Sequence, residues 1–179
     1  SRRRFRFWSF SYKIRGFLRR LRLLGVKFDG AGNVAWENTI GGSGSDILNV
    51  IRETADNGFI LGGTSFSGLS GEKTEAGIGS ADYWTVKLDN NGNIEWQNTI
   101  GGTGADDLLA LDITDDGGFL LGGHSSSPVS GDKTLPTYGP SGNTDYWILK
   151  LDAAGTIEWQ KVYGGNNVDV CYAAAQTSD

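Results

Sequence analysis

The sequence is poor in the side chains that most catalytic and metal sites use. Its 179 residues include one cysteine, one histidine, no methionine and three prolines. A single cysteine cannot form an internal disulfide, and a single histidine leaves no histidine pair for a metal site. No apolar run approaches the roughly 20 residues that cross a bilayer, so we expect no membrane span. These shortages indicate a chain that is not an enzyme and that needs no cofactor.

Positive charge is scarce outside the first 24 residues. That segment holds nine Lys or Arg and no acidic residue, whereas residues 25–179 hold the other seven bases and all 21 acids. Phosphate binding needs clustered Lys and Arg, which the acidic part lacks. We therefore expect no nucleic-acid partner.

Glycine is abundant, and it marks an internal repeat. The tryptophans at 36, 96 and 159 and the glycines at 41, 101 and 164 recur at steps of 60 and 63 residues. Residues 25–84 form one copy, residues 85–147 a second, and residues 148–179 a third copy that we expect to be truncated. Such self-similarity predicts a repeat architecture.

Each copy has the periodicity of short strands joined by tight turns. Residues 83–89 place Trp84, Val86 and Leu88 on one face, opposite Tyr83, Thr85 and Lys87. Asn90, Asn91 and Gly92 predict a hairpin turn into a second strand at 94–100. Further strands are expected at about 107–114 and 119–123, separated by an Asp-Asp-Gly-Gly turn. The copy therefore predicts four antiparallel strands.

The predicted fold is all-β. Four-stranded sheets repeated about every 60 residues favour a partial β-propeller, whose blades bury their apolar faces only against neighbouring blades. The alternative architecture is a β-solenoid or a stacked β-sheet array, which has the same local signals. In either case, the first partners of each copy are the neighbouring blades of the full-length chain.

The repeat resembles a known family. Residues 82–106 and 114–134 give the patterns DYWxxKLDxxGxIxWQxTIGGxGxD and TxDGGFxLGGxSxSxxSGDKT. These patterns are similar to the β-propeller repeats of secreted bacterial proteins of the delta-60-related type, common in Bacteroidota proteins that carry a type IX secretion sorting domain. The resemblance implies a secreted or outer-membrane-associated protein. It implies a non-enzymatic scaffold or interaction module, or alternatively a glycan-binding or carbohydrate-active propeller whose site lies in further blades.

The basic segment, residues 1–24, fits no secretory signal peptide because charges interrupt every apolar run. It is either a disordered or amphipathic tail or a frame-shifted reading of a preceding blade linker. The codons CGA CTA CTG G for residues 22–25, read one base later, give Asp-Tyr-Trp, the motif found sixty residues onward. The encoding DNA tests this hypothesis directly.

Two glycine-rich loops match the calcium nonapeptide pattern GGxGxDxUx. They contain Asp46 and Asp106. A calcium β-roll needs this motif in tandem, whereas here it recurs every 60 residues. We expect each aspartate to cap its own turn, with calcium binding at Asp46 and Asp106 as the alternative.

Aromatic residues suggest two kinds of surface. The repeated tryptophans, Trp36, Trp96 and Trp159, could stack on sugars, but their alternation with Glu and Gln predicts core packing between blades. Tyr83 and Tyr146 lie opposite the buried faces of Trp84 and Trp147. We therefore expect the two tyrosines to be exposed and to form a ligand surface for a glycan or a protein.

Three further features look inert. His124 stands where the preceding copy has Thr64, and no Asp or Cys lies at triad spacing, so a polar surface role is expected. Cys171 aligns with Leu48 and Leu108, which predicts a buried apolar site. The serine-rich linkers, residues 64–70 and 125–130, have the composition of flexible surface loops. Whether the wider linkers, 64–82 and 124–145, converge on a charged pocket discriminates a binding module from a spacer.

Overall fold

The computed structural model describes residues 22–140 and 142–178. In this part of the chain every regular element is a β-strand, and no helix long and apolar enough to cross a bilayer is found there. The all-β, antiparallel prediction is therefore confirmed. Residues 1–21 lie outside the described part, so the alternatives for the basic segment are not tested. Only residues 22–24 of that segment are described, and β1 begins among them.

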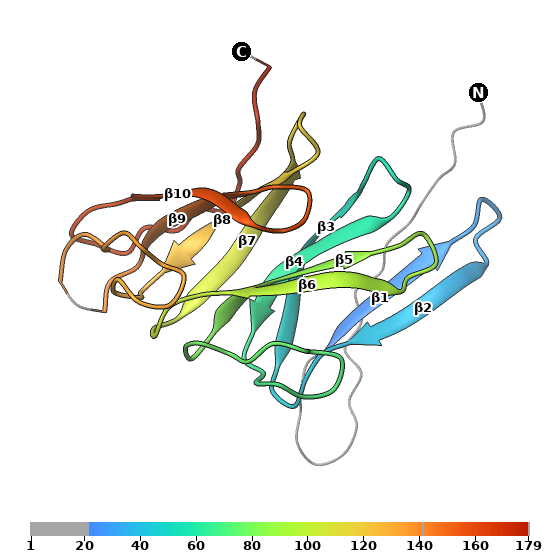
Figure 1. Ribbon diagram of the computed structural model, residues 1–179, viewed down its shortest axis with the longest axis horizontal. Coiled ribbons are helices and arrows are strands. Elements are labelled where there is room, and N and C mark those ends of the chain that lie inside the picture. The colour runs from blue at the N-terminus through green and yellow to red at the C-terminus, as the bar shows by residue number, and fades with distance from the viewer. Residues whose placement is uncertain (1–21, 141, 179) are drawn as a thin grey trace.

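Within residues 22–140 and 142–178, ten strands form three sheets that follow one another across Figure 1. The strands are β1 (Leu23–Phe28), β2 (Val34–Ile40), β3 (Asp46–Glu53), β4 (Phe59–Ser65), β5 (Asp82–Leu88), β6 (Ile94–Ile100), β7 (Asp106–Ile113), β8 (Phe119–Ser125), β9 (Asp145–Leu151) and β10 (Ile157–Tyr163). A two-stranded sheet pairs β1 with β2, and two four-stranded sheets have the orders β3-β4-β5-β6 and β10-β9-β8-β7. All neighbouring strands in these sheets are antiparallel.

The sheets are grouped out of phase with the sequence repeat. The strands β3 and β4 lie in the copy 25–84, β6 lies in the copy 85–147, and β5 crosses the boundary between them. Each four-stranded sheet therefore joins the end of one copy to the beginning of the next by backbone hydrogen bonds. Successive copies are therefore joined both by the polypeptide chain and by the backbone hydrogen bonds of a common sheet.

Hairpin turns place the strands in register. Asp89 accepts hydrogen bonds from the backbone N–H groups of Asn91 (2.8 Å) and Asn93 (2.9 Å). Gly92 closes this turn at φ +85°, a conformation that favours glycine. The equivalent turns at Asp29 and Asp152 use the same side-chain caps.

Two apolar clusters lie between the sheets. The first lies between β1-β2 and β3-β6 and is built from Leu23, Ile40, Phe59, Leu61, Trp84, Val86 and Leu88. The second joins β3-β6 to β7-β10 and includes Ile60, Tyr83, Ile100, Leu108, Phe119, Leu121, Trp147 and Leu149. Because β5 contributes to both clusters, its whole length from Asp82 to Leu88 is buried. The predicted alternation of its two faces is confirmed.

The chain after β10 follows the path that β7 takes one copy earlier. Cys171 and Ala174 align with Leu108 and Leu111, and both lie against Gly122, where an added Cβ would be 3.2 Å from the Cys171 sulfur and 3.1 Å from the Ala174 Cβ. Leu108 and Leu111 lie in the same way against Gly62. Residues 168–178 form no strand, but they cover part of the outer face of the β7-β10 sheet.

Candidate functional site

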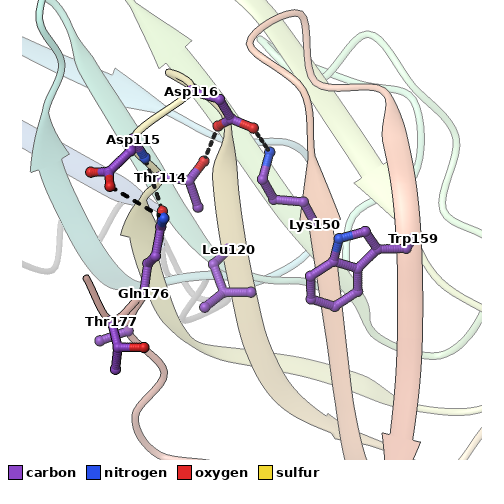
Figure 2. A pocket seen from close by; sticks show the side chains of 9 residues that line it. Thr114, Asp115, Asp116, Leu120, Lys150, Trp159, Gln176 and Thr177 are labelled. Atoms are coloured by element: carbon purple, nitrogen blue, oxygen red, sulfur yellow. Dashed lines mark hydrogen bonds and ion pairs between the residues drawn. The ribbon is translucent and has the colours of Figure 1, made fainter. Parts of the chain in front are cut away.

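A cavity of about 510 Å³ lies on the outer face of the β7-β10 sheet (Figure 2). Three strands each place one side chain there: Leu120 from β8, Lys150 from β9 and Trp159 from β10. The rest of the lining comes from the β7-β8 turn and the C-terminal segment, namely Thr114, Asp115, Asp116, Ala175, Gln176 and Thr177. The site thus combines a broad aromatic surface with charged and amide groups.

Lys150 is the electrostatic centre of this site. Its ammonium group lies 2.8 Å from a carboxylate oxygen of Asp116 and 2.8 Å from one of Glu158. Burial alone would lower the pKa of Lys150, but the hydrogen bonds to both carboxylates outweigh it and raise that pKa above its ordinary value. The bond from Lys150, with a second from Thr114, lowers the pKa of Asp116. Lys150 therefore stays charged and is unsuited to act as a base.

The same ion triad occurs one copy earlier. Lys87 lies 2.7 Å from Asp56 and 2.8 Å from Glu95. Because the same triad occurs in two successive sheets, it is explained by the fold: each lysine joins a hairpin turn to the neighbouring strand. The recurrence of lysine at 27, 87 and 150 marks the repeat in the sequence, but it did not predict these ion pairs.

Trp159 is 44% exposed, so the prediction of core packing is wrong for this tryptophan. Trp36 and Trp96 are partly buried against the two clusters, and their rings make edge contacts with Phe59 and Phe119, each at a centroid distance of 5.8 Å. The difference has a clear cause. The turn of the following copy covers Trp36 and Trp96, whereas no described residue covers Trp159 in that way.

Tyr83 is fully buried, so the expectation that it is exposed is wrong. Its hydroxyl group donates a hydrogen bond to the carbonyl oxygen of Trp147 at 2.9 Å, across the interface between the two four-stranded sheets. Burial raises its pKa well above the ordinary value. The face opposite Trp84 is covered by the next sheet, which the alternation pattern of one strand cannot reveal. Tyr146, at the equivalent position of β9, is 36% exposed.

Asp46 and Asp106 are buried inside the glycine-rich loops. Asp46 accepts hydrogen bonds from the Gly42 N–H group (2.7 Å) and from the hydroxyl groups of Ser65 (2.6 Å) and Ser67 (2.9 Å). Asp106 accepts from the Gly102 N–H group at 2.7 Å and from Ser127 at 2.8 Å. These are the contacts of a turn-capping carboxylate, as the first interpretation predicted.

The same loops explain the repeated glycines. A Cβ on Gly42 would lie 2.5 Å from the Ser67 Cβ, and one on Gly44 would lie 2.3 Å from the carbonyl oxygen of Phe66. Only glycine lets the serine-rich linker approach this closely. Within the described residues, no group of three or more His, Cys, Asp or Glu side chains is placed to hold a metal ion. Calcium binding at Asp46 and Asp106, the alternative to turn capping, stays untested.

The serine-rich linkers are held in place, so the prediction of flexible surface loops is wrong. Ser65, Ser67, Ser125 and Ser127 are buried, and the linkers pack on the glycine-rich loops through side-chain and backbone hydrogen bonds. Their composition resembles that of a disordered linker because small hydroxyl side chains serve both as solvated groups and as caps.

Buried lysines are the residues that sequence reasoning missed in these linkers. Lys73 and Lys133 are each 1% exposed. Lys73 donates to the Thr99 hydroxyl and lies 5.3 Å from the centroid of Trp84, and Lys133 donates to the Leu135 carbonyl at 2.6 Å. Burial lowers the pKa of both lysines, although nearby carboxylates oppose that shift. The signal was their fixed place in the repeated Ser-Gly-x-Lys-Thr motif.

The structure pairs His124 with Asp107, a partner that sequence spacing did not suggest. The two residues face each other across the β7-β8 ladder, with 3.3 Å between His124 Nε2 and an Asp107 carboxylate oxygen. The hydrogen bond with His124 lowers the pKa of Asp107. The side chain of His124 is only 20% exposed, so it is a half-buried structural partner and not a free surface group.

Cys171 is buried, as predicted. Burial raises the pKa of its thiol, and the thiol donates a weak hydrogen bond to the Ala173 carbonyl at 3.3 Å. A thiol with a raised pKa is a poor nucleophile. The structure therefore gives Cys171 a packing role.

Comparison with known proteins leaves the family open. Neither a protein-family model nor a curated protein matches this chain.

Proposed function

We propose that this chain is a non-enzymatic repeat scaffold that displays interaction surfaces outside the cell or at its surface, built as a partial β-propeller of the delta-60-related type. The observation that carries the proposal is that the polar residues of the repeated motif contact other parts of the chain. Asp46, Ser67 and Lys73, and their counterparts Asp106, Ser127 and Lys133, all face one another or the backbone of the loop end. Because these side chains fix the loops in place, their role is structural, as expected of a scaffold.

The arrangement of the sheets supports a propeller as the complete architecture. Successive sheets pack face to face through the same positions, and β7 packs beside β3 and β4, as expected of inner strands that gather round an axis. Bulges fall at the same place in β3 and β7, between Leu48 and Val50 and between Leu108 and Ala110. Repeated bulges of this kind bend each inner strand in the same way.

The cellular part of the proposal is tested by proteolytic shaving of intact producing cells, with an antibody raised against this chain. The expected result is loss of the antigen from unbroken cells. Protection until the cells are lysed would contradict a surface or secreted location. The non-enzymatic part is tested by incubating the purified chain with a panel of polysaccharides, and release of reducing ends that Trp159→Ala abolishes would overturn it.

A second candidate function is glycan binding at Trp159. A half-exposed indole with a charged and amide rim is the kind of surface on which a sugar ring stacks while its hydroxyl groups are hydrogen-bonded. A glycan array followed by calorimetry tests it. Binding that Trp159→Ala removes and that Tyr138→Ala, an exposed aromatic control on a linker, leaves intact would favour this candidate. Absence of binding on the array would exclude it.

A further inference from the structure

Trp36 and Trp96 are each covered by the hairpin turn of the following copy. A Cβ built on Gly92 would lie 2.9 Å from the ring of Trp36, and one built on Gly155 would lie 3.1 Å from the ring of Trp96. The contact includes polar groups, because the Trp36 indole N–H donates to the Asn90 carbonyl at 3.0 Å and Asn38 donates to the Gly92 carbonyl at 2.7 Å. Asn98 makes the same bond to Gly155. The chain thus shows one docking contact twice.

The receiving half of this contact occurs a third time, at Trp159. The indole is 44% exposed and lines the open cavity of Figure 2. Lys161 holds the position of Asn38 and Asn98, two residues further along the strand, and can donate a hydrogen bond as those amides do. The floor beside the indole is formed by Leu120, which is the counterpart of Ile60 in the preceding sheet.

The inserting half also occurs a third time, in the turn Asp29–Asn33 between β1 and β2. Asp29 caps this turn with bonds to the N–H groups of Ala31 (2.8 Å) and Asn33 (2.9 Å), as Asp89 caps the next turn. Gly32 has φ +86°, matching +85° at Gly92 and +88° at Gly155. Among the described residues, nothing lies within 4 Å of a Cβ built on Gly32. Val34, at the base of the turn, is 55% exposed.

We propose that two copies of this chain associate head to tail, with the Asp29–Asn33 turn of one copy seated on Trp159 of the partner copy. The two surfaces are the two halves of an interface that the chain already forms twice within itself. Their shapes are therefore complementary, and Lys161 supplies the hydrogen-bond donor that Asn38 and Asn98 supply in the internal contacts. The inference deepens the scaffold function and rests on it. Because each molecule carries one inserting and one receiving surface, the contact is heterologous. The assembly therefore either closes into a ring or extends as a filament.

Sedimentation velocity over a concentration series tests self-association of the wild-type chain. The expected result is a sedimentation coefficient that rises with concentration. Trp159→Ala removes the receiving surface, and Gly32→Asn blocks the inserting one, because asparagine tolerates positive φ but adds a side chain above the turn. Each variant should weaken association at least about 30-fold, the loss expected when a central interface tryptophan is truncated. One control, the exposed linker residue variant Tyr138→Ala, should associate like wild type.

Mixing the two impaired variants gives the sharpest result. Trp159→Ala keeps its inserting turn and Gly32→Asn keeps its receiving tryptophan, so an equimolar mixture should form a one-to-one heterodimer although each variant alone stays monomeric. Circular dichroism of each variant establishes that it is folded. A monomeric wild type, or a mixture that stays monomeric, would overturn the proposal. Neither result would contradict the scaffold function, which is tested separately by cell-surface shaving and by the absence of glycan turnover. If glycans compete with self-association for Trp159, that result overturns the proposal and supports glycan binding at this site.

Discussion

Replacing Tyr83 by phenylalanine isolates one hydrogen bond between the two four-stranded sheets. The ring is fully buried and lies 5.1 Å from the ring of Trp147, a contact that phenylalanine preserves. The hydroxyl group that is lost donates to the Trp147 carbonyl at 2.9 Å. Removing a buried donor leaves its acceptor away from water, which costs about 1–3 kcal/mol of the free energy of unfolding. In a domain of this size that loss lowers the melting temperature by about 2–4 °C per kcal/mol.

Tyr146→Phe is the matched control, because this residue holds the same position in the next sheet and is 36% exposed. Because this residue is partly exposed, the free energy of unfolding should change by less than about 0.5 kcal/mol. Urea unfolding followed by tryptophan fluorescence measures both variants. Equal losses for Tyr83→Phe and Tyr146→Phe, or no loss for Tyr83→Phe, would refute the inter-sheet hydrogen bond as a source of stability.

Three further predictions concern the glycine-rich loops. Ser127→Ala leaves the Gly104 N–H group and one Asp106 oxygen without their hydroxyl partner, so urea unfolding should show a loss of about 1–3 kcal/mol. Ser126→Ala, whose partly exposed hydroxyl group bonds to the backbone of Ala105, should cost less. Burial raises the pKa of Asp106 above 3.8 although hydrogen bonds from Gly102 and Ser127 oppose it, so the folded state binds this proton more tightly than the unfolded chain does. The stability contribution of Asp106 should therefore be greatest below its unfolded pKa and be lost as pH rises through its folded pKa; a pH series that gives the same slope for wild type and Asp106→Asn would contradict this. Calcium should leave the melting temperature unchanged, because donors already occupy both carboxylate oxygens of Asp46, and a calcium-dependent rise that Asp46→Asn removes would show otherwise.

The local elements were predictable because they depend on near neighbours in the sequence. The strand expected at 94–100 coincides with β6, and the turn at Asn90, Asn91 and Gly92 is present with the expected positive φ at glycine. Which strands share a sheet was not predictable from one copy, because an edge strand can form a hydrogen-bonded ladder with the strand before it or the strand after it. The sheets in fact join the end of one copy to the start of the next.

The candidate site was predictable only in part. Alternation placed Tyr83 opposite Trp84 correctly, but it could not show that a second sheet covers that face. For Trp159, alternation with Glu158 and Gln160 predicted burial, whereas exposure depends on which segment lies above the ring. The pairing of His124 with Asp107 depends on the β7-β8 register, and the linker serines are buried through contacts with a loop about twenty residues earlier.

The turns at Gly92 and Gly155 cover the tryptophans of the preceding copies, Trp36 and Trp96. The α-proton chemical shifts of Gly32, Gly92 and Gly155 test this arrangement most directly, because a proton held against the face of an indole ring is shifted strongly upfield. At low protein concentration, we expect upfield shifts for Gly92 and Gly155 that Trp36→Ala and Trp96→Ala respectively abolish, and an ordinary shift for Gly32. Ordinary shifts for all three glycines would contradict it.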